Sequence, residues 1–391
     1  MNRYTYLIVG GGMTGDAAAQ GIREIDSSGT IGLVSAEPYQ PYNRPPLSKG
    51  LWKGDPEAKI WRPKAAKSDV LLGRRIVSLD ARGKRATDDK GTTFEFEKLL
   101  LATGGTPRRL SGDSDRIIYY RTYDDYRRLR AAAKSGARIA VIGGGFIGSE
   151  VAAALRLQGC DVVMLVPEQG VSARVFPADL SANLVEYYRD KGVEMRIGEG
   201  MTGLESSGGK VVIKTSSGKA ISADLAVAGL GIVPNTELAQ QAGLRVDNGI
   251  VVDEHLRTNV SDIYAAGDVA NFYNPVLDTR MRVEHEDNAN TMGRAAGRAM
   301  AGAPAPYHHL PFFYSDLFEL GYEAVGELDP RLETVSEWKQ PFREGVIYYL
   351  KEGRVRGVLL WNTWGQVDAA RALIAERGPF TAQSLRGRLP Q

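Results

Sequence analysis

The sequence contains a single cysteine, Cys160, in a chain of 391 residues. One cysteine cannot form a disulfide bond within the chain, so the sequence excludes enzymes that relay electrons through a cysteine pair. A protein without disulfide bonds does not depend on an oxidising compartment, and we therefore expect it in the cytoplasm.

Long apolar runs and a large net charge are also absent. No apolar run reaches the length of a membrane span, so we expect no membrane-embedded segment. Lysine and arginine number 49 and aspartate and glutamate 47, which gives a net charge of +2 and excludes a general attraction to nucleic acid or anionic membranes. Since Tyr6–Val9 already has the pattern of a first buried strand, we expect no signal peptide before it.

A glycine pattern occurs near the start of the chain, between an expected strand and an expected helix over 16–25. It consists of Gly10, Gly12 and Gly15, with Thr14 inside the turn. In such a turn the first glycine permits a tight bend, the second lets the backbone approach a pyrophosphate, and the third lets helix pack on strand. Glu37, after the next strand, can accept hydrogen bonds from a ribose. Alone, this motif also fits an ordinary glycine-rich turn.

The same pattern returns at Gly143, Gly145 and Gly148, before an expected helix over 149–157. Two copies in one chain predict two bound dinucleotides. Glu168 follows the next strand, where an acidic side chain accepts from a ribose 2′-hydroxyl and repels a 2′-phosphate, so NADH is expected over NADPH. Arg174 lies nearby and weakens this inference, because an arginine can receive a 2′-phosphate.

Between the two turns, residues 41–49 form a proline-rich basic segment. Pro45 and Pro46 make it stiff, and Arg44 and Lys49 are its cations. The segment could clamp phosphates or a flavin, or it could be a solvated basic turn. Composition does not favour either interpretation.

Two further strand ends carry candidate ligand-binding residues. Ala102, Thr103 and Gly104 end an apolar strand, where small side chains permit close approach of a ligand, although a plain strand end is the favoured interpretation. Asp268 follows another strand, at the edge where open α/β sheets bind ligands, and can bind a polyol hydroxyl. The expected helix over 288–301 could direct its N-terminus at an anionic ring.

Residues 312–361 alternate between polar and apolar and are rich in aromatic side chains, which predicts an antiparallel sheet. A helix is expected near 366–376, and the last dozen residues are expected to be loose. Trp361 and Trp364 follow an apolar strand. Core or interface packing is the favoured interpretation for both, and a place in a flavin pocket is the alternative.

With these motifs placed, the chain resembles the FAD- and NAD(P)-dependent pyridine nucleotide oxidoreductases. Among them it is most similar to the ferredoxin (rubredoxin, putidaredoxin) reductases and apoptosis-inducing factor. The resemblance runs from about residue 4 to 376 and rests on the two turns and on the segments PYNRPPLSK, LLLATGG, YAAGD, GGGFIGSE, RVEHED and YSDLFELGYEAVG. It implies an α/β fold with two Rossmann-like domains: a discontinuous FAD-binding domain (1–112 and 240–308) and an NADH-binding domain (113–239). A C-terminal α+β domain with an antiparallel sheet is expected at 309–391.

The resemblance also assigns cofactor contacts, with FAD on the first turn and NADH on the second. Lys49 and Glu150 correspond to an ion pair beside flavin N5 and are the expected catalytic pair. Tyr314 stands where family members often carry a tryptophan near the flavin. The expected FAD contacts are Gly10, Gly12, Thr14, Gly15, Glu37, Arg44, Lys49, Val77, Ala102, Thr103, Gly104, Arg121, Asp268, Glu284, His285 and Tyr314. The expected NADH contacts are Gly143, Gly145, Phe146, Ile147, Gly148, Glu150, Glu168, Arg174, Gly231 and Glu284.

The reaction implied is hydride transfer from NADH to flavin N5, followed by delivery of single electrons to a small iron–sulfur protein of the ferredoxin type. One alternative is a diaphorase that reduces a quinone, oxygen or a dye. Another is an NADH sensor like apoptosis-inducing factor, with slow turnover, a long-lived charge-transfer complex and signalling through dimerisation. We expect a monomer or weak homodimer without a metal site and without nucleic-acid or membrane partners.

Overall fold

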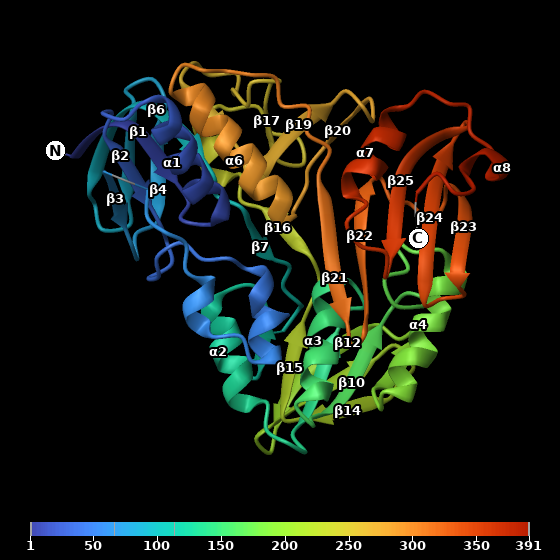
Figure 1. Ribbon diagram of the computed structural model, residues 1–391. Helices are drawn as coiled ribbons and strands as arrows, with labels where there is room; N and C mark the ends of the chain where they lie inside the picture. Colours follow the sequence, from blue (N-terminus) through green and yellow to red (C-terminus); the bar gives the residue numbers. More distant parts are fainter. Residues whose placement is uncertain (1, 66, 113, 390–391) are drawn as a thin grey trace. The chain divides into compact units, whose positions relative to one another are not determined.

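The computed structural model describes residues 2–65, 67–112 and 114–389, and its chain divides into two compact units. Unit 1 comprises the residues up to Arg44 together with Pro56–Thr106 and Val233–Pro311. Unit 2 comprises Pro45–Asp55, Pro107–Ile232 and the residues from Phe312 onward. Apart from the short segment Pro45–Asp55, the chain passes from unit 1 to unit 2 within β7 (Gly105–Pro107), returns within β16 (Ile232–Pro234) and passes to unit 2 again after Pro311. Figure 1 labels the elements of both units.

Unit 1 is built on a sheet in the order β3–β2–β1–β6–β5–β4, with β18 also paired to β6. The buried Leu99–Leu101 stretch of β6 pairs in parallel with both β1 and β18, which explains why it is apolar on both faces. The strands are β1 (Asn2–Val9), β2 (Ile31–Val34), β3 (Ser68–Leu71), β4 (Ile76–Asp80), β5 (Arg85–Asp88), β6 (Thr93–Leu101) and β18 (Ile263–Ala265).

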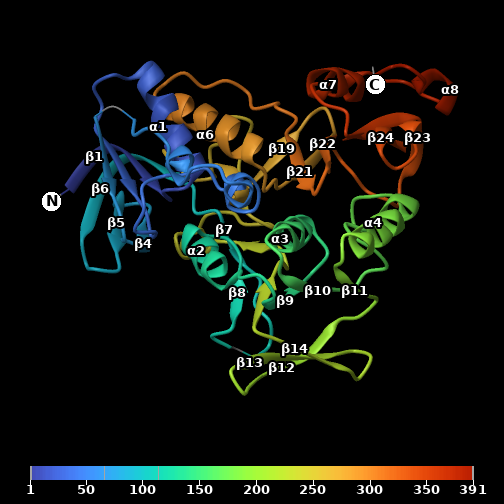
Figure 2. The same ribbon diagram turned by 60° about the horizontal axis from the view of Figure 1, so that its bottom comes forward.

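Helices α1 (Met13–Ile25) and α6 (Glu286–Met300) lie side by side in unit 1 (Figures 1 and 2). Glycines bring their backbones together: a Cβ at Gly293 or Gly297 would lie 2.4 Å from Thr14 O or 2.1 Å from Ala18 O. The remaining elements of the unit are η3 (Glu57–Ile60), α5 (Glu237–Gln241), β17 (Ile250–Val251), η4 (Gly267–Val269), β19 (Ala270–Asn274) and β20 (Thr279–Met281).

Unit 2 contains a parallel sheet in the order β11–β10–β9–β15–β8 and a small antiparallel sheet in the order β12–β13–β14. The parallel strands are β8 (Ile117–Tyr119), β9 (Arg138–Ile142), β10 (Asp161–Val166), β11 (Glu194–Ile197) and β15 (Leu225–Ala228). The helices are α2 (Tyr123–Ala132), α3 (Phe146–Leu157) and α4 (Ala178–Asp190), and the antiparallel strands are β12 (Met201–Ser207), β13 (Lys210–Thr215) and β14 (Ala220–Ala223). The segment Pro45–Asp55 adds the short helices η1 (Pro45–Leu47) and η2 (Gly50–Lys53).

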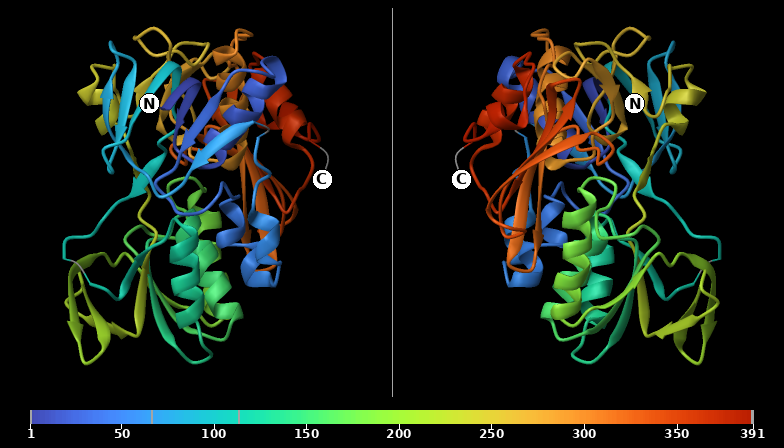
Figure 3. Two further views of the ribbon diagram at one scale, coloured as in Figure 1. Left: turned by 90° about the vertical axis from the view of Figure 1, so that its left-hand side faces the viewer. Right: turned by 90° about the vertical axis from the view of Figure 1, so that its right-hand side faces the viewer.

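The last part of unit 2 is an antiparallel sheet in the order β21–β22–β25–β24–β23, coloured orange to red in Figure 3. Its elements are β21 (Phe312–Leu317), β22 (Leu320–Gly326), β23 (Glu333–Gln340), β24 (Glu344–Lys351), β25 (Arg354–Trp361), α7 (Val367–Ala375) and α8 (Ala382–Leu385). Trp361 is fully buried and stacks on Tyr322 with 5.8 Å between ring centroids, so it packs in the core. Trp364 is 51% exposed.

The expected α/β fold with a C-terminal antiparallel sheet is confirmed, and some local expectations were wrong. Helices α1 and α3 begin at Met13 and Phe146, each with the second glycine of its turn as N-cap, rather than after the third glycine. Near the end of the described residues, a capping box between Thr381 and Ser384 starts the short helix α8, which the sequence did not predict. No helix in the described ranges is long and apolar enough to cross a membrane.

Candidate functional site

The first glycine turn connects β1 to α1 in unit 1. Gly10 has a φ of +121°, and a Cβ there would lie 2.1 Å from the carbonyl oxygen of Ala102. A Cβ at Gly15 would lie 2.0 Å from Gly10 O, whereas one at Gly12 would meet no described atom within 4 Å. The first and third glycines are therefore required by the chain itself, and the second faces open space at a helix N-terminus. This arrangement fits the pyrophosphate of a dinucleotide.

The second turn, between β9 and α3 in unit 2, repeats this geometry. A Cβ at Gly143 would lie 2.5 Å from Gly229 O, and one at Gly148 would lie 2.0 Å from Gly143 O. A Cβ at Gly145 would again meet no atom of the described residues within 4 Å. Each unit thus has its own turn with the same three glycine environments, as two dinucleotides require.

A cluster of charged groups surrounds the acid that follows β2 in unit 1. Glu37 forms an ion pair with Arg44 and accepts a hydrogen bond of 2.5 Å from the hydroxyl of Tyr42. Tyr42 in turn accepts a bond of 3.0 Å from Arg44 Nη1. Burial opposes the charge of Arg44, but Tyr42, Glu37 and Asp268 together hold the pKa of its guanidinium above the ordinary value. Glu37 is thereby fixed as an acceptor, which suits a ribose hydroxyl.

Val77 lies on β4 of unit 1, and the residues just before β4 are hydrogen-bonded to the backbone at Glu37 and Ser35. The amide of Gly73 donates to Glu37 O at 3.1 Å, and that of Arg74 donates to Ser35 O at 2.8 Å. Val77 itself is 48% exposed and sits at an irregularity in the pairing of β4 with β5. An exposed apolar side chain suits contact with a nucleotide base.

The small residues after β6 are held by one asparagine of the same unit. Thr103 Oγ1 donates to Asn235 O, and Asn235 Nδ2 donates to Thr103 O, each at 2.8 Å. The backbone amide of Asn235 donates to Gly104 O at 3.0 Å. These bonds fix the strand end at Ala102, whose carbonyl lies against Gly10. The hydroxyl of Thr103 therefore donates its hydrogen bond to another residue of the protein.

Arg282 brings together two expected FAD contacts of unit 1. It donates to Asp268 O at 3.1 Å and forms an ion pair of 2.6 Å with Glu284. Asp268 lies in η4, and a Cβ at the first residue of η4 would be 2.2 Å from Thr14 Oγ1, so Asp268 lies close to the first turn. His285 is the N-cap of α6. Asp268, Glu284 and His285 therefore lie on neighbouring segments around this turn.

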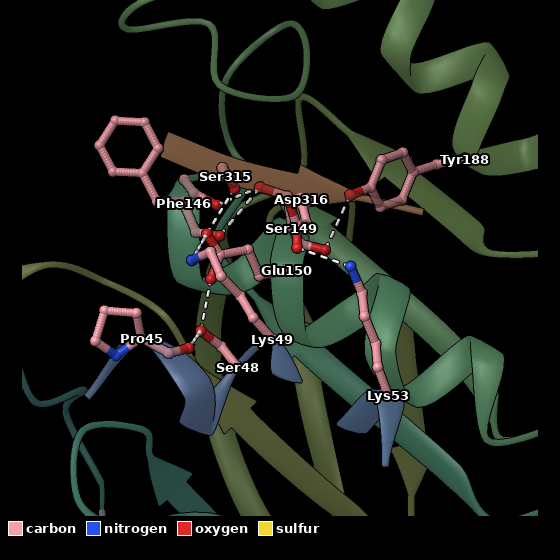
Figure 4. Close-up of polar contacts among 11 residues, drawn as sticks. Pro45, Ser48, Lys49, Lys53, Phe146, Ser149, Glu150, Tyr188, Ser315 and Asp316 are labelled. Carbon is pink, nitrogen blue, oxygen red and sulfur yellow. Dashed lines mark hydrogen bonds and ion pairs between the residues drawn. The ribbon is translucent and has the colours of Figure 1, made fainter. Parts of the chain in front are cut away.

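In unit 2 the carboxylate of Glu150 is the centre of a buried network (Figure 4). Lys49 Nζ lies 2.6 Å from Glu150 Oε1, and the two side chains are 12% and 2% exposed. Ser315 Oγ donates to the same oxygen at 2.5 Å, and Ser48 Oγ donates to Oε2 at 2.5 Å. Three segments, Pro45–Asp55, α3 and β21, thus meet at one carboxylate, which accepts three hydrogen bonds.

Strand β21 contacts the segment Pro45–Asp55 at two further residues. Lys49 Nζ lies 5.1 Å from the ring centroid of Tyr314, a distance suited to a cation–π interaction. Lys53 Nζ lies 2.7 Å from Asp316 Oδ2. The expected ion pair and the expected flavin-side tyrosine are therefore neighbours in this unit.

Two tyrosines close the network and remain protonated. Burial, followed by the charge of Glu150, raises the pKa of both Tyr188 and Tyr322 well above the ordinary value. Tyr188 donates its hydroxyl proton to Ser149 O at 2.9 Å (Figure 4). Neither phenol is ionised, so neither can serve as a base here.

Arg121 precedes α2 and is anchored through its neighbours in unit 2. Its amide donates to Asp125 Oδ2 at 3.1 Å. The adjacent Tyr120 donates to Leu47 O at 2.5 Å, and Trp52 Nε1 donates to the same oxygen at 2.7 Å. Arg121 therefore lies at the start of a helix whose entry is fixed against the segment that carries Lys49.

The residues expected to contact NADH surround the second turn. Glu168, after β10, forms an ion pair of 2.6 Å with Arg174, whose side chain is 84% exposed. The ring of Phe146 lies 5.0 Å from that of Phe313, and Ile147 is 38% exposed. Gly231 accepts a hydrogen bond of 3.0 Å from the Arg108 amide. The acid at the expected ribose position is thus paired with the cation that could receive a 2′-phosphate.

Sequence reasoning missed the residues that hold these groups in place, which are Tyr42, Ser48, Arg282, Ser315 and Tyr188. Tyr42 and Ser48 lie inside the segment 41–49, and Arg282 and Ser315 lie inside the quoted segments RVEHED and YSDLFELGYEAVG, but nothing in these patterns indicated their contacts. Tyr188 lies outside any motif, and its partner Ser149 is 39 residues away. No spacing rule could have identified them.

Two dinucleotide turns, each with its acid, define the class of oxidoreductases that combine a flavin with a pyridine nucleotide. Residues 4–293 match the family described as pyridine nucleotide-disulphide oxidoreductase. Residues 296–341 and 336–376 match the C-terminal domain of mitochondrion-associated apoptosis-inducing factor. The chain belongs to the pyridine nucleotide-disulphide oxidoreductase family.

Individual relatives agree with this assignment. Apoptosis-inducing factor 1, mitochondrial, of Dictyostelium discoideum is 34% identical over 96% of this chain and 79% of its own length. The anthranilate 1,2-dioxygenase system ferredoxin–NAD(+) reductase component of Burkholderia cepacia is also 34% identical, over 96% and 95%. A crystal structure of the covalent putidaredoxin reductase–putidaredoxin complex matches with a TM-score of 0.90 and 31% identity, covering 97% of this chain and 94% of that chain. The chain is accordingly an NADH-dependent flavoprotein oxidoreductase whose cofactors are FAD and NAD(H).

Proposed function

We propose that this protein is an NADH-dependent reductase that passes electrons from FAD to a small iron–sulfur protein of the ferredoxin type. The observation that carries the proposal is the buried ion pair between Lys49 and Glu150, which ties the segment Pro45–Asp55 to helix α3. Relatives named for ferredoxin reduction support the acceptor. The only cysteine, Cys160, is buried, so an internal thiol relay is excluded and electrons would leave without one.

The protein's own residues would bind, orient and hold charge. Bound FAD supplies the chemistry by which a two-electron donor serves one-electron acceptors. The turn at Gly12 would bind the FAD pyrophosphate and the turn at Gly145 that of NADH. Lys49 would donate a hydrogen bond towards the reacting ring, because Glu150 holds its ammonium in place. Glu150 Oε2 accepts a hydrogen bond from Ser48 and could accept another from the nicotinamide carboxamide. The contacts named above and the division into three domains are part of this proposal.

A second candidate is an NADH sensor that resembles apoptosis-inducing factor. The match of residues 296–376 to the C-terminal domain of that protein favours it. Such a protein would turn over slowly and would change its oligomeric state when NADH binds. For the reductase we propose instead a cytoplasmic monomer or weak homodimer. A reductase does not need to change this oligomeric state during turnover.

The two candidates, and a quinone reductase, are distinguished by their acceptors. We expect NADH-dependent cytochrome c reduction that rises with added putidaredoxin, used here as a ferredoxin probe, and a molecular mass that NADH leaves unchanged. Turnover with a quinone alone would indicate the diaphorase. Slow turnover with every acceptor, together with a mass increase on NADH addition, would contradict the reductase and support the sensor.

A further inference from the structure

Asp16 is a buried carboxylate in the first turn of α1, directly after the third glycine of the first turn. Its oxygen Oδ2 lies 2.7 Å from Arg62 Nε, and the side chains of Asp16 and Arg62 are 5% and 17% exposed. A negative charge at this position opposes what the turn is built to bind. The helix N-terminus favours an anion, and an unpaired carboxylate beside it would repel a pyrophosphate.

The second turn shows that the fold does not require an acid here. Ser149 occupies the corresponding position directly after Gly148, and its hydroxyl donates to Gly145 O at 2.5 Å. At this position the second turn therefore needs no compensating cation. The first turn has both the acid and its cation.

Arg62 also connects Asp16 to the segment that carries Arg44. Its Nη1 donates to Asn43 Oδ1 at 2.8 Å, and its amide donates to Pro41 O at 2.9 Å. The Asn43 amide donates to Ile60 O at 2.8 Å. One guanidinium thus compensates the acid at the turn and fixes the residue immediately before Arg44, whose partner is Glu37.

We propose that Arg62 is a positioning residue for FAD, which cancels the charge of Asp16 at the first turn and sets the place of Arg44 through Asn43. The inference rests on the proposed placement of FAD on this turn. It does not depend on the electron acceptor, so it can fail while ferredoxin reduction stands. It requires that the pair acts on FAD affinity and not only on folding.

The test is the affinity of the holoprotein for FAD, measured as recovery of FAD fluorescence on serial dilution. We expect Arg62→Leu to weaken FAD binding by roughly tenfold or more, because a carboxylate is left without its partner beside the pyrophosphate. The double variant Asp16→Asn/Arg62→Leu should recover most of this loss, since no charge remains to be compensated. Arg62→Lys should fall between, because it keeps the charge but cannot reach both Asp16 and Asn43.

The matched control is Arg356→Leu in unit 2. Arg356 is 13% exposed and pairs with Glu327 at 2.7 Å. The variant therefore removes an arginine of similar burial from an ion pair of the same length. We expect its FAD affinity to equal that of the unmodified protein. The proposal would be overturned if Arg62→Leu bound FAD as tightly as the unmodified protein. It would also be overturned if the double variant bound FAD as weakly as Arg62→Leu. If Arg62→Leu does not fold, the comparison of Arg62→Gln with Asp16→Asn/Arg62→Gln gives the same decision, because glutamine is also uncharged.

Discussion

Lys49 and Glu150 are 101 residues apart in the chain, and their side chains form an ion pair with 2.6 Å between Nζ and Oε1. Both side chains are buried, so solvent screens their attraction much less than that of a surface pair. Breaking a buried pair by removing one partner costs about 3–5 kcal/mol of stability. Every test of the pair must therefore separate its effect on folding from its effect on electron transfer.

Ser315 gives the mildest change at this network. Ser315→Ala leaves the ion pair intact but removes one of the two donors to Glu150 Oε1, which should cost about 1.5–3 kcal/mol in the free energy of unfolding. We expect FAD reduction by NADH to slow several-fold, because Glu150 is less firmly oriented. Ser336→Ala, on the outer strand β23 of the same sheet, is the control. An unchanged reduction rate in a destabilised Ser315→Ala variant would show that the serine is only structural.

Glu168 is expected to determine the choice between NADH and NADPH. Glu168→Ala removes the acceptor for the ribose hydroxyl and releases Arg174 from its ion pair. The ratio of kcat/KM for NADH to that for NADPH should fall by roughly tenfold or more, which corresponds to about 1.4 kcal/mol. Adding Arg174→Ala should remove any gain in NADPH use. A ratio that stays unchanged in Glu168→Ala would place the selectivity elsewhere.

The glycine turns allow a test within one motif. Gly145 has a φ of −81°, and a Cβ there meets no described atom, so Gly145→Ala should fold normally. Its methyl group would occupy the space expected for the NADH pyrophosphate, so the KM for NADH should rise by about tenfold or more while FAD content stays normal. Gly143→Ala should instead destabilise the protein, since its Cβ would lie 2.5 Å from Gly229 O. Normal NADH kinetics in Gly145→Ala would contradict the placement of NADH.

The two C-terminal tryptophans should behave differently. Trp361 is buried against Tyr322 and Phe176, and its indole nitrogen donates to Phe342 O at 3.0 Å. Trp361→Ala should lower the free energy of unfolding by about 3–5 kcal/mol. Trp364→Ala should lower it far less, because Trp364 is half exposed. Denaturant unfolding of both variants provides the measurement, and equal losses would contradict the core position of Trp361.

The two glycine turns could be predicted from the sequence because each is a local pattern whose physics is complete within a few residues. The acids Glu37 and Glu168 follow from the same pattern. The bonds from Ser48 and Ser315 to Glu150 span 102 and 165 residues, and hydroxyl donors to a carboxylate leave no periodic signal. The pair of Asp16 and Arg62 was missed for the same reason. The starts of α1 and α3 were misplaced because the backbone amides of each helix N-terminus begin at the second glycine of the turn, not at the third.

The most direct test of the central claim is anaerobic rapid mixing of NADH with the FAD-loaded protein. We compare the unmodified chain with Lys49→Met and with Lys53→Met, whose lysine lies four residues after Lys49 and pairs with Asp316 rather than with Glu150. The account predicts that Lys49→Met keeps its FAD but reduces it about one to two orders of magnitude more slowly, because the oriented positive charge is lost. Lys53→Met should reduce FAD at the unmodified rate. Equal rates in all three proteins would contradict the role of the Lys49–Glu150 pair.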